Sequence, residues 1–296
     1  MDTYFIYDGI IEIPIGTTHL KTSNRFNEHI DIPNTVTHLI FGYDYNQPTD
    51  HLPQSITHLT FGYDYNQPTN HLPSNITHLT FGWRYNHISN HLPQSITHLT
   101  FGYHYNHISN HLPSNITHLT FGNDYNHISD HLPQSITHLT FSACYNHISD
   151  HLPQSITHLR FGINYNHISN HLPQSITHLR FGYHYNQPSN NLPQSITHLT
   201  FGADYNHIID HLPQSITHLT FGYNYNQPIV FPKYITSITF YGTFDPYIDA
   251  LCELYDLIHT NILEPSIVDH IDKNKHNLTI KSLLLLNLSF DILENN

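Results

Sequence analysis

Apolar and polar residues recur along this chain with a fixed period of 20 positions. Residues 51–70 read HLPQSITHLTFGYDYNQPTN, and residues 71–90 read HLPSNITHLTFGWRYNHISN. Ten consecutive blocks of this kind run from residue 31 to residue 230, with a weaker copy before them and a degraded copy after them. A period of this kind is typical of a repeat protein whose units stack upon one another.

The length of the repeat predicts one short strand and a return path in each coil. Repeats built from two helices need about 33 residues or more, so 20 residues are too few for them. The candidate strand covers residues 56–61, which are rich in β-branched and aromatic side chains and lie between Pro53 and Gly62. Apolar and polar side chains alternate within it, which predicts one apolar and one polar face.

Stacked coils would bring equivalent side chains into columns. Four apolar columns are expected to form a continuous core, because a single coil cannot bury them alone. In the block that begins at residue 51 they are Ile56, Leu59, Phe61 and Tyr65. The Asn66 column has no interruption over ten blocks, which predicts an asparagine ladder whose amides bond to backbone groups in the turn. Gly62 recurs in nine of the ten blocks, which indicates a tight turn or a close contact between coils.

These patterns predict a repeat solenoid of parallel β coils, with about twelve coils of 20 residues. Residues 1–12 are expected to form an N-terminal capping strand or hairpin, and residues 13–243 to form the solenoid. Residues 244–296 are expected to form a mainly helical C-terminal cap, because apolar residues after Pro246 follow a helical spacing. A docking module for another protein is the alternative for that last segment.

Two motifs resemble known families. The spacing Ile56-x-x-Leu59-x-Phe61 resembles the opening of a leucine-rich repeat. Residues 65–68, Tyr-Asn-Gln-Pro, lie beside Leu-Pro-x-Ser-Ile-Thr-His-Leu and resemble the core of the FNIP repeat over about residues 13–243. The resemblance implies a leucine-rich-repeat-like coil and a family found mainly in social amoebae and giant viruses of amoebae. Some members carry an F-box and resemble ubiquitin-ligase adaptors, whereas only about twelve residues precede the first coil here.

Composition narrows the classes of partner. The 296 residues include 9 Lys and Arg against 22 Asp and Glu, a formal net charge of −13, which argues against nucleic acid as a partner. The longest strongly apolar run, residues 283–286, is too short to span a bilayer, and the first residues lack the features of a signal peptide. We therefore expect no membrane partner and a cytoplasmic location, in the host cytoplasm if the protein is viral. The two cysteines exclude a disulfide framework.

Three columns on or just after the candidate strand differ from block to block, whereas most other columns repeat. Positions freed from the demands of stacking can serve recognition, and Tyr, Trp and Arg are the residue types that anchor interfaces. We therefore predict a partner-binding strip on the strand side, with neutral drift on a solvated face as the alternative. Its residues are Tyr43, Tyr63, Trp83, Arg84, Tyr103, His104, Arg160, Arg180, Tyr183 and His184.

Most of the 31 histidines fall into three columns, which begin at His38, His51 and His87. One interpretation is a ladder of neutral imidazoles that bond along the solenoid. A second is metal binding between adjacent rungs, but a structural zinc site needs four converging ligands, and a flat ladder offers two at a time. We therefore assign neither metal nor cofactor. The third is a pH response, with a loss of stability or solubility below roughly pH 6, because stacked like charges repel.

The sequence contains no recognisable catalytic motif, and the histidines, threonines and serines recur as parts of the repeat. We therefore predict no catalytic residues and no enzyme activity. The favoured function is a non-catalytic scaffold for protein–protein interaction, whose partner would be an unidentified protein, a host protein if the chain is viral. The alternatives are a substrate-recognition adaptor of a ubiquitin ligase and a self-assembling structural protein. The sequence leaves the oligomeric state open.

Overall fold

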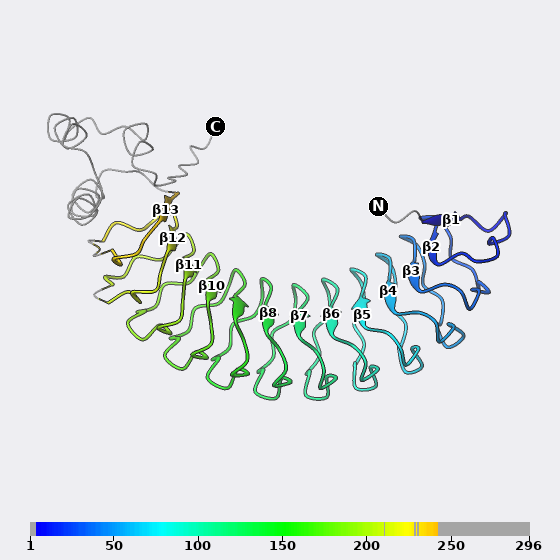
Figure 1. The fold of residues 1–296 in the computed structure, drawn as a ribbon, viewed down its shortest axis with the longest axis horizontal. Coiled ribbons are helices and arrows are strands. Elements are labelled where there is room, and N and C mark those ends of the chain that lie inside the picture. Colours follow the sequence, from blue (N-terminus) through cyan, green and yellow to red (C-terminus); the bar gives the residue numbers. More distant parts are fainter. Residues whose placement is uncertain (1–3, 210, 228, 230, 242–296) are drawn as a thin grey trace, which may run out of the picture. The chain divides into compact units, whose positions relative to one another are not determined.

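The structure is a computed structural model that describes residues 4–209, 211–227, 229 and 231–241. The chain divides into two compact units, with the boundary between Thr157 and His158. Both units consist of coils of about 20 residues, and each coil contributes one short strand (Figure 1). The predicted C-terminal cap, residues 244–296, lies outside the described residues.

The first unit contains eight strands: β1 (Phe5–Tyr7), β2 (His19–Thr22), β3 (His38–Ile40), β4 (His58–Thr60), β5 (His78–Thr80), β6 (His98–Thr100), β7 (His118–Thr120) and β8 (His138–Thr140). The second unit contains five: β9 (His158–Arg160), β10 (His178–Arg180), β11 (His198–Thr200), β12 (His218–Phe221) and β13 (Ser237–Phe240). Within each unit, strands pair in parallel with their neighbours in sequence, so the predicted parallel β-solenoid is confirmed.

Strand register follows the repeat. Equivalent residues of successive coils face each other, as with Leu59 and Leu79 in β4 and β5. At the N-terminus, β1 pairs in parallel with β2, so the first residues add a strand to the sheet. The described residues contain about eleven turns, one fewer than the sequence predicts. The copy that begins at Phe231 is described only to Tyr241, so only part of it enters this count.

Each strand has three or four residues, which is shorter than the six predicted, because a turn closes on either side of it. In the coil of β4, the Ile56 amide donates to the Pro53 carbonyl, and the Tyr65 amide donates to the Gly62 carbonyl. Hydrogen bonds between coils continue beyond the strand: the Phe61 amide donates to the Thr80 carbonyl at 2.9 Å. The residues predicted as strand are therefore linked between coils even where the strand geometry ends.

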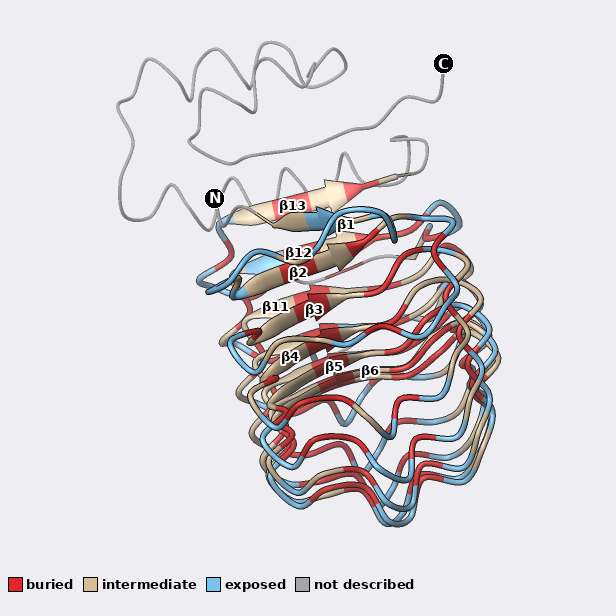
Figure 2. Ribbon diagram, turned by 90° about the vertical axis from the view of Figure 1, so that its right-hand side faces the viewer, coloured by how far each residue is buried: buried red, intermediate tan, exposed pale blue. Residues whose placement is uncertain are grey.

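The four predicted apolar columns form the core. Their members are between 0% and 3% exposed in the coils of β3 to β12 (Figure 2). Within a coil the phenylalanine and tyrosine rings stack, with 3.7 Å between the ring centroids of Phe101 and Tyr105. Between coils the tyrosine rings stack again at 6.2 Å from Tyr85 to Tyr105. Each coil therefore completes the burial of its neighbour, as a stacked repeat requires.

The asparagine and glycine columns hold successive coils at a fixed distance. The Asn86 side-chain oxygen accepts the Asn106 backbone N–H at 3.1 Å, so the asparagine ladder is confirmed. The glycine column allows a close contact between coils, since a Cβ atom on Gly102 would overlap the carbonyl oxygen of Gly82. Ser142 occupies the same column, and its hydroxyl donates to the Phe121 carbonyl at 2.8 Å.

Candidate interaction surface

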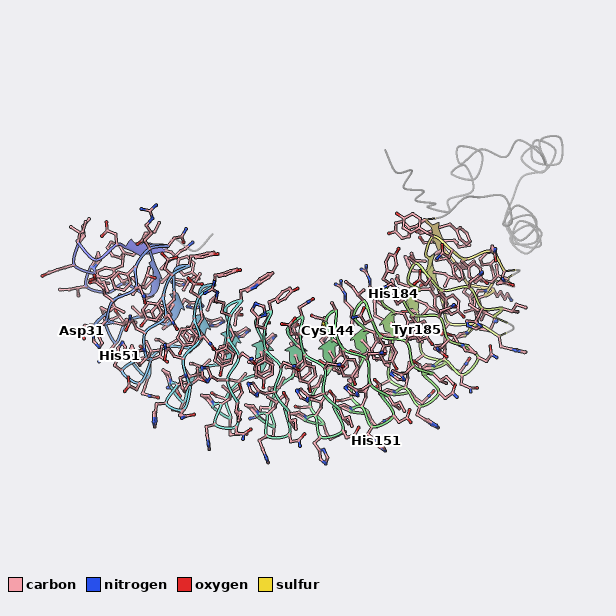
Figure 3. All side chains as sticks on the ribbon, turned by 180° about the vertical axis from the view of Figure 1, so that it is seen from behind. Asp31, His51, Cys144, His151, His184 and Tyr185 are labelled. Carbon is pink, nitrogen blue, oxygen red and sulfur yellow. The ribbon has the colours of Figure 1, made fainter. Side chains whose placement is uncertain are left out.

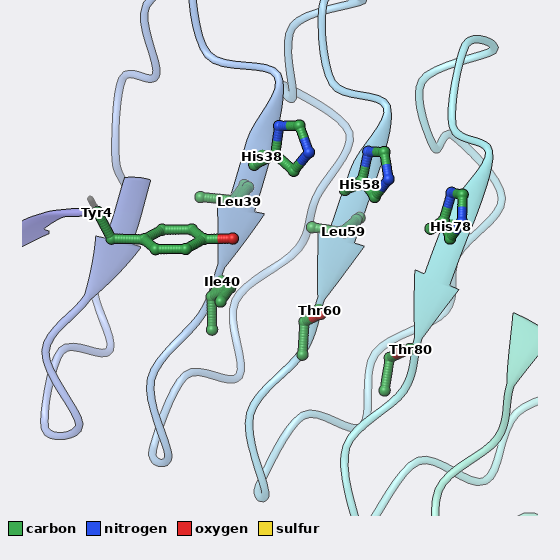
Figure 4. A pocket seen from close by; sticks show the side chains of 9 residues that line it. All are labelled: Tyr4, His38, Leu39, Ile40, His58, Leu59, Thr60, His78 and Thr80. Carbon is green, nitrogen blue, oxygen red and sulfur yellow. The ribbon is translucent and has the colours of Figure 1, made fainter. Parts of the chain in front are cut away.

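The polar face of the strands carries a row of stacked imidazoles, which we call the histidine row. In each unit the rings of neighbouring strands lie 4.1–4.2 Å apart at interplanar angles of 9–14°. The Thr57 hydroxyl lies 2.9 Å from His58 Nδ1, and the same contact recurs in other coils. Figure 4 shows the rings of His38, His58 and His78 side by side along three strands.

This row differs from the predicted ladder in how its members interact. They stack face to face and bond to a threonine of their own coil, whereas the sequence predicts hydrogen bonds along the solenoid. Burial lowers the pKa of His58 to about 4, and repulsion from His78 and His38 adds to the shift. The pKa values of His98, His178 and His198 are lowered for the same reasons. These four imidazoles are therefore neutral at pH 7.

A small hollow of about 140 Å³ lies over the first part of this row, where Tyr4 approaches β3 and β4 (Figure 4). The Tyr4 ring meets the edge of His19 at 5.3 Å. Tyr4 lines the hollow together with residues of three strands, which include His38, Ile40 and Thr60. A volume of that size holds a few water molecules and no larger ligand.

The His87 column does bond along the solenoid. His107 Nε2 donates to the Asn86 carbonyl at 3.0 Å, and His207 Nε2 makes the same bond to Asn186. These imidazoles extend the asparagine ladder, so the predicted hydrogen-bonded ladder is found in this column. Among the described residues, no group of three or more His, Cys, Asp or Glu side chains is arranged to hold a metal ion.

Four of the predicted binding residues form a second row of stacked rings, which we call the aromatic row: Tyr43, Tyr63, Trp83 and Tyr103. It lies in the turn that follows each strand. Ring centroids are 4.5 Å apart from Tyr43 to Tyr63, 5.4 Å from Tyr63 to Trp83, and 4.0 Å from Trp83 to Tyr103. Tyr43 and Trp83 are 47% and 41% exposed, respectively. Because the faces cover one another, the row presents ring edges and hydroxyl groups to solvent.

Charged residues next to the aromatic row are already paired within the unit. Arg84 Nε lies 3.1 Å from an Asp64 carboxylate oxygen, and its guanidinium lies over the Tyr63 ring at 5.8 Å. His104 Nδ1 lies 2.8 Å from an Asp124 carboxylate oxygen. The structure therefore joins six predicted residues in the first unit, but Arg84 and His104 offer a partner less free charge than the sequence suggests.

The other four predicted residues lie in the second unit. Arg160 and Arg180 face each other across β9 and β10, and both are exposed. Tyr183 follows in the next turn and is 52% exposed. His184 lies beside it, and its Nδ1 is 2.7 Å from an Asp204 carboxylate oxygen. His184 is exposed, whereas its neighbour Tyr185 is fully buried; both are labelled in Figure 3.

Sequence reasoning missed one further exposed row, on the turn that precedes the next coil. Isoleucines are 51–59% exposed there; they are Ile88, Ile108, Ile128, Ile148, Ile168 and Ile208. An open groove of about 380 Å³ runs between Ile88 and Ile108 and is lined by polar neighbours that include His107 and His111. The sequence did contain a signal that this column is exposed. Some coils have proline in place of isoleucine, as at Pro68, and a buried core column would not vary in this way.

Two further observations bear on function. Cys144 is a partly buried free thiol in the turn column that otherwise holds residues such as Asp124. The described part of the chain contains no helix of the length and apolar character that a membrane span requires.

Coils with one short parallel strand, an apolar interior and a polar strand face define a leucine-rich-repeat-like solenoid. The FNIP Repeat family matches in successive segments of the chain, at residues 7–44, 45–71, 69–104, 105–144, 145–184, 167–204, 185–224 and 205–242. The chain therefore belongs to the FNIP repeat family, and the resemblance seen in the sequence is confirmed. The match is to a repeat solenoid family, which is not a known catalytic family.

The chain is also similar to CroV588, a giant-virus protein whose crystal structure is described as a novel circular LRR protein structure. The two share 44% sequence identity with a TM-score of 0.72, over 79% of this chain and 38% of that one. The chain thus spans well under half of the length of that protein. A comparison with curated proteins gave no significant match.

Proposed function

We propose that this chain is a non-catalytic scaffold for protein–protein interaction and that it binds its partner with the variable turn residues on the strand side. The observation that supports this proposal is the aromatic row. Its four large rings are partly exposed and lie next to columns that are constant, whereas their own column changes to Asn123 and Ala143 in later coils. Burial explains the constant apolar columns and hydrogen bonds between coils explain the constant asparagine column, and neither explains this row.

The arrangement of the row suits recognition. Tyr and Trp bury a large area with few rotatable bonds, and they are enriched among the residues that dominate binding energy. Each ring is held by its neighbours at 4.0–5.4 Å, so little side-chain freedom is lost when a partner docks. The Arg84–Asp64 pair braces the middle of the row and limits its movement further.

The row also has a defined end. The column continues with Asn123 after Tyr103, so the aromatic surface covers four coils, or about 15 Å at 4.8 Å per strand. A specific interface buries about 800 Å² on each partner. The partner must therefore extend from the row onto the adjoining strand face, which offers Thr80 and Thr100 beside the histidine row.

Trp83 gives a direct test, because it is the only tryptophan in the chain. Proteins captured from an amoeba lysate on the wild-type chain should be absent or strongly reduced on Trp83→Ala and Tyr103→Asn variants. Both substitutions place a residue that the same column contains elsewhere, at Ala203 and Asn123, so the coils should fold normally. The control variant Ile108→Asn changes an exposed residue outside the aromatic row, which is 57% exposed against 41% for Trp83.

A purified captured partner should then reduce the quenching of Trp83 fluorescence by acrylamide, since the ring would become covered. Equal capture by wild-type and row variants would refute the use of this surface. Capture of ubiquitin-ligase subunits through the row would favour the adaptor function. Concentration-dependent self-association in size-exclusion chromatography, abolished by Trp83→Ala, would favour the self-assembling structural protein.

A further inference from the structure

Arg160 and Arg180 form an isolated pair of like charges on the strand face of the second unit. They are directly opposite each other in the parallel register of β9 and β10. Strands in such a pair lie about 4.8 Å apart, so the two side chains leave the sheet side by side. The equivalent positions in β11 and β12 are Thr200 and Thr220, as in most other coils.

No acidic group of the described residues neutralises this pair. In the following turns, Asp204 already accepts a hydrogen bond from His184 and another from the Asn224 amide at 3.1 Å. Partial burial and repulsion from Arg180 lower the pKa of Arg160. Like charges placed opposite each other destabilise a sheet. An anion bound between them would remove that cost.

We propose that Arg160 and Arg180 bind the phosphate monoester group of a phosphorylated peptide segment in a partner protein. This inference rests on the proposed function and specifies the chemistry that one part of the surface recognises. Guanidinium groups bind phosphate oxygens through two parallel N–H donors each, and one phosphate dianion matches the two positive charges.

Spacing favours a phosphate over a pair of carboxylates. Side chains on one face of an extended peptide are about 6.8 Å apart, twice the rise per residue of a strand. The two arginines lie on strands only about 4.8 Å apart, so one central dianion fits them better than two acidic side chains of the same peptide. His158 and His178 lie two residues earlier on the same face and line the approach.

Charge also separates a peptide from a membrane as the source of the phosphate. The whole chain has a formal charge of −13 and only 9 basic residues, so an anionic lipid surface would repel it. A short peptide can reach the arginine pair without bringing a large charged surface close to the acidic parts of the chain. Tyr183 and His184 in the next turn are placed to contact residues beside the phosphate.

The four arginines of the chain allow a site-resolved test on the full-length protein. Arginine Nε–H signals of ¹⁵N-labelled protein would be followed by NMR during titration with phenyl phosphate at pH 7.5 and low ionic strength. We expect the signals of Arg160 and Arg180 to shift and saturate, while those of Arg25 and Arg84 stay nearly unchanged. Benzoate and benzenesulfonate, which carry one charge, should bind at least about tenfold more weakly.

Matched variants replace each arginine with threonine, the residue that most other coils have in this column. Arg160→Thr and Arg180→Thr should each weaken phenyl phosphate at least about tenfold and leave the melting temperature unchanged or raised, because a repulsion is removed. Equal shifts of all four arginines, equal affinity for benzoate, or full binding by the threonine variants would overturn the phosphate site.

Two further arms test the source of the phosphate. A peptide with one phosphoserine should bind more tightly than its unphosphorylated form, and this difference should vanish in Arg160→Thr. Arginine-dependent sedimentation with vesicles containing phosphatidylserine would instead assign the pair to membranes and overturn the peptide proposal. The aromatic-row variants keep both arginines, so they should give the same titrations even if they capture no partner. The two proposals can therefore fail separately.

Discussion

The histidine row and the aromatic row are both ladders of stacked rings, and yet only one of them is constant. Histidine occupies its column in every coil from β2 to β12, with a ring spacing of 4.1–4.2 Å. The aromatic row has similar spacings of 4.0–5.4 Å, but its column changes to Asn123 and Ala143 in later coils. Stacking between coils therefore does not by itself fix the identity of a residue.

The difference lies in the contacts that each ring makes within its own coil. Histidines of the row lie within hydrogen-bond distance of the threonine that precedes them, as His98 does at 2.9 Å from Thr97. Tyr105 likewise approaches Ser109 within its coil. The rings of Tyr63 and Trp83 contact mainly the neighbouring coils. We infer that contacts inside the coil keep a column constant, and that a column without them is free to change with the partner.

The largest effect is expected from a constant interior ring. Tyr105→Ala removes a fully buried side chain that stacks on Phe101 and on two neighbouring tyrosines, so it should lower the free energy of unfolding by about 3–5 kcal/mol. Chemical denaturation followed by circular dichroism would measure it. Tyr105→Phe is the control: it keeps the rings and loses only the hydroxyl contact with Ser109, for about 1 kcal/mol. A loss as small for alanine as for phenylalanine would contradict the stacked core.

The second effect concerns the histidine row and pH. The folded-state pKa values of His78, His98 and His198 lie below the value of about 6.5 expected in the unfolded chain, and the pKa of His58 is about 4. The unfolded chain therefore binds more protons as the pH falls, so stability is complete above about pH 6.5 and is lost toward pH 4. We expect the melting temperature to be several degrees lower at pH 5 than at pH 7.5.

Proton NMR titration of the imidazole ring protons would assign this loss to the row. Added salt should recover only part of the stability, because it screens repulsion between imidazoles but does not undo their burial. An unchanged melting temperature between pH 7.5 and pH 5 would show that the histidine row is not a titrating element of the fold.

A third, smaller effect is expected from the asparagine ladder. Asn106→Ala removes the oxygen that accepts the Asn126 backbone N–H at 3.1 Å, and it should cost about 1 kcal/mol because water can replace the bond at this exposed turn. Asn106→Asp keeps an acceptor oxygen and should lose less. Thermal melting of the three proteins would rank them, and an equal loss for alanine and aspartate would mean that this oxygen is not what holds the turn.

Periodicity predicted the coil and its core but not the orientation of every turn residue. Ile96 and Ile108 both recur every 20 residues, but the first is 0% exposed and the second 57%. Alternation assigns faces within a strand, and Ile108 lies in an irregular turn where that rule does not apply. The adjacent Ser109 is buried instead, since the Tyr105 hydroxyl inside the coil needs a polar partner.

The candidate surface was predictable in its residues but not in their interactions. Variation between coils identified the column of Trp83, and the structure adds that its rings stack and present their edges. The sequence could not show that Arg84 and His104 are paired with aspartates of the preceding and following coils, because that depends on side-chain direction in the turn. Arg160 and Arg180 were visible as neighbours, and register then placed them face to face.

The smallest effect on stability is expected where the effect on binding is greatest. Trp83→Ala removes two stacking contacts at a site that is 41% exposed, and alanine already occupies this column at Ala203. Its free energy of unfolding should fall by no more than about 1 kcal/mol, measured by circular dichroism, because the interior columns are untouched. Trp83→Tyr should keep the row continuous between Tyr63 and Tyr103 and retain both stability and partner capture. If Trp83→Ala instead destabilised the chain as much as Tyr105→Ala does, the aromatic row would belong to the architecture of the coil, and its variation would no longer point to a partner.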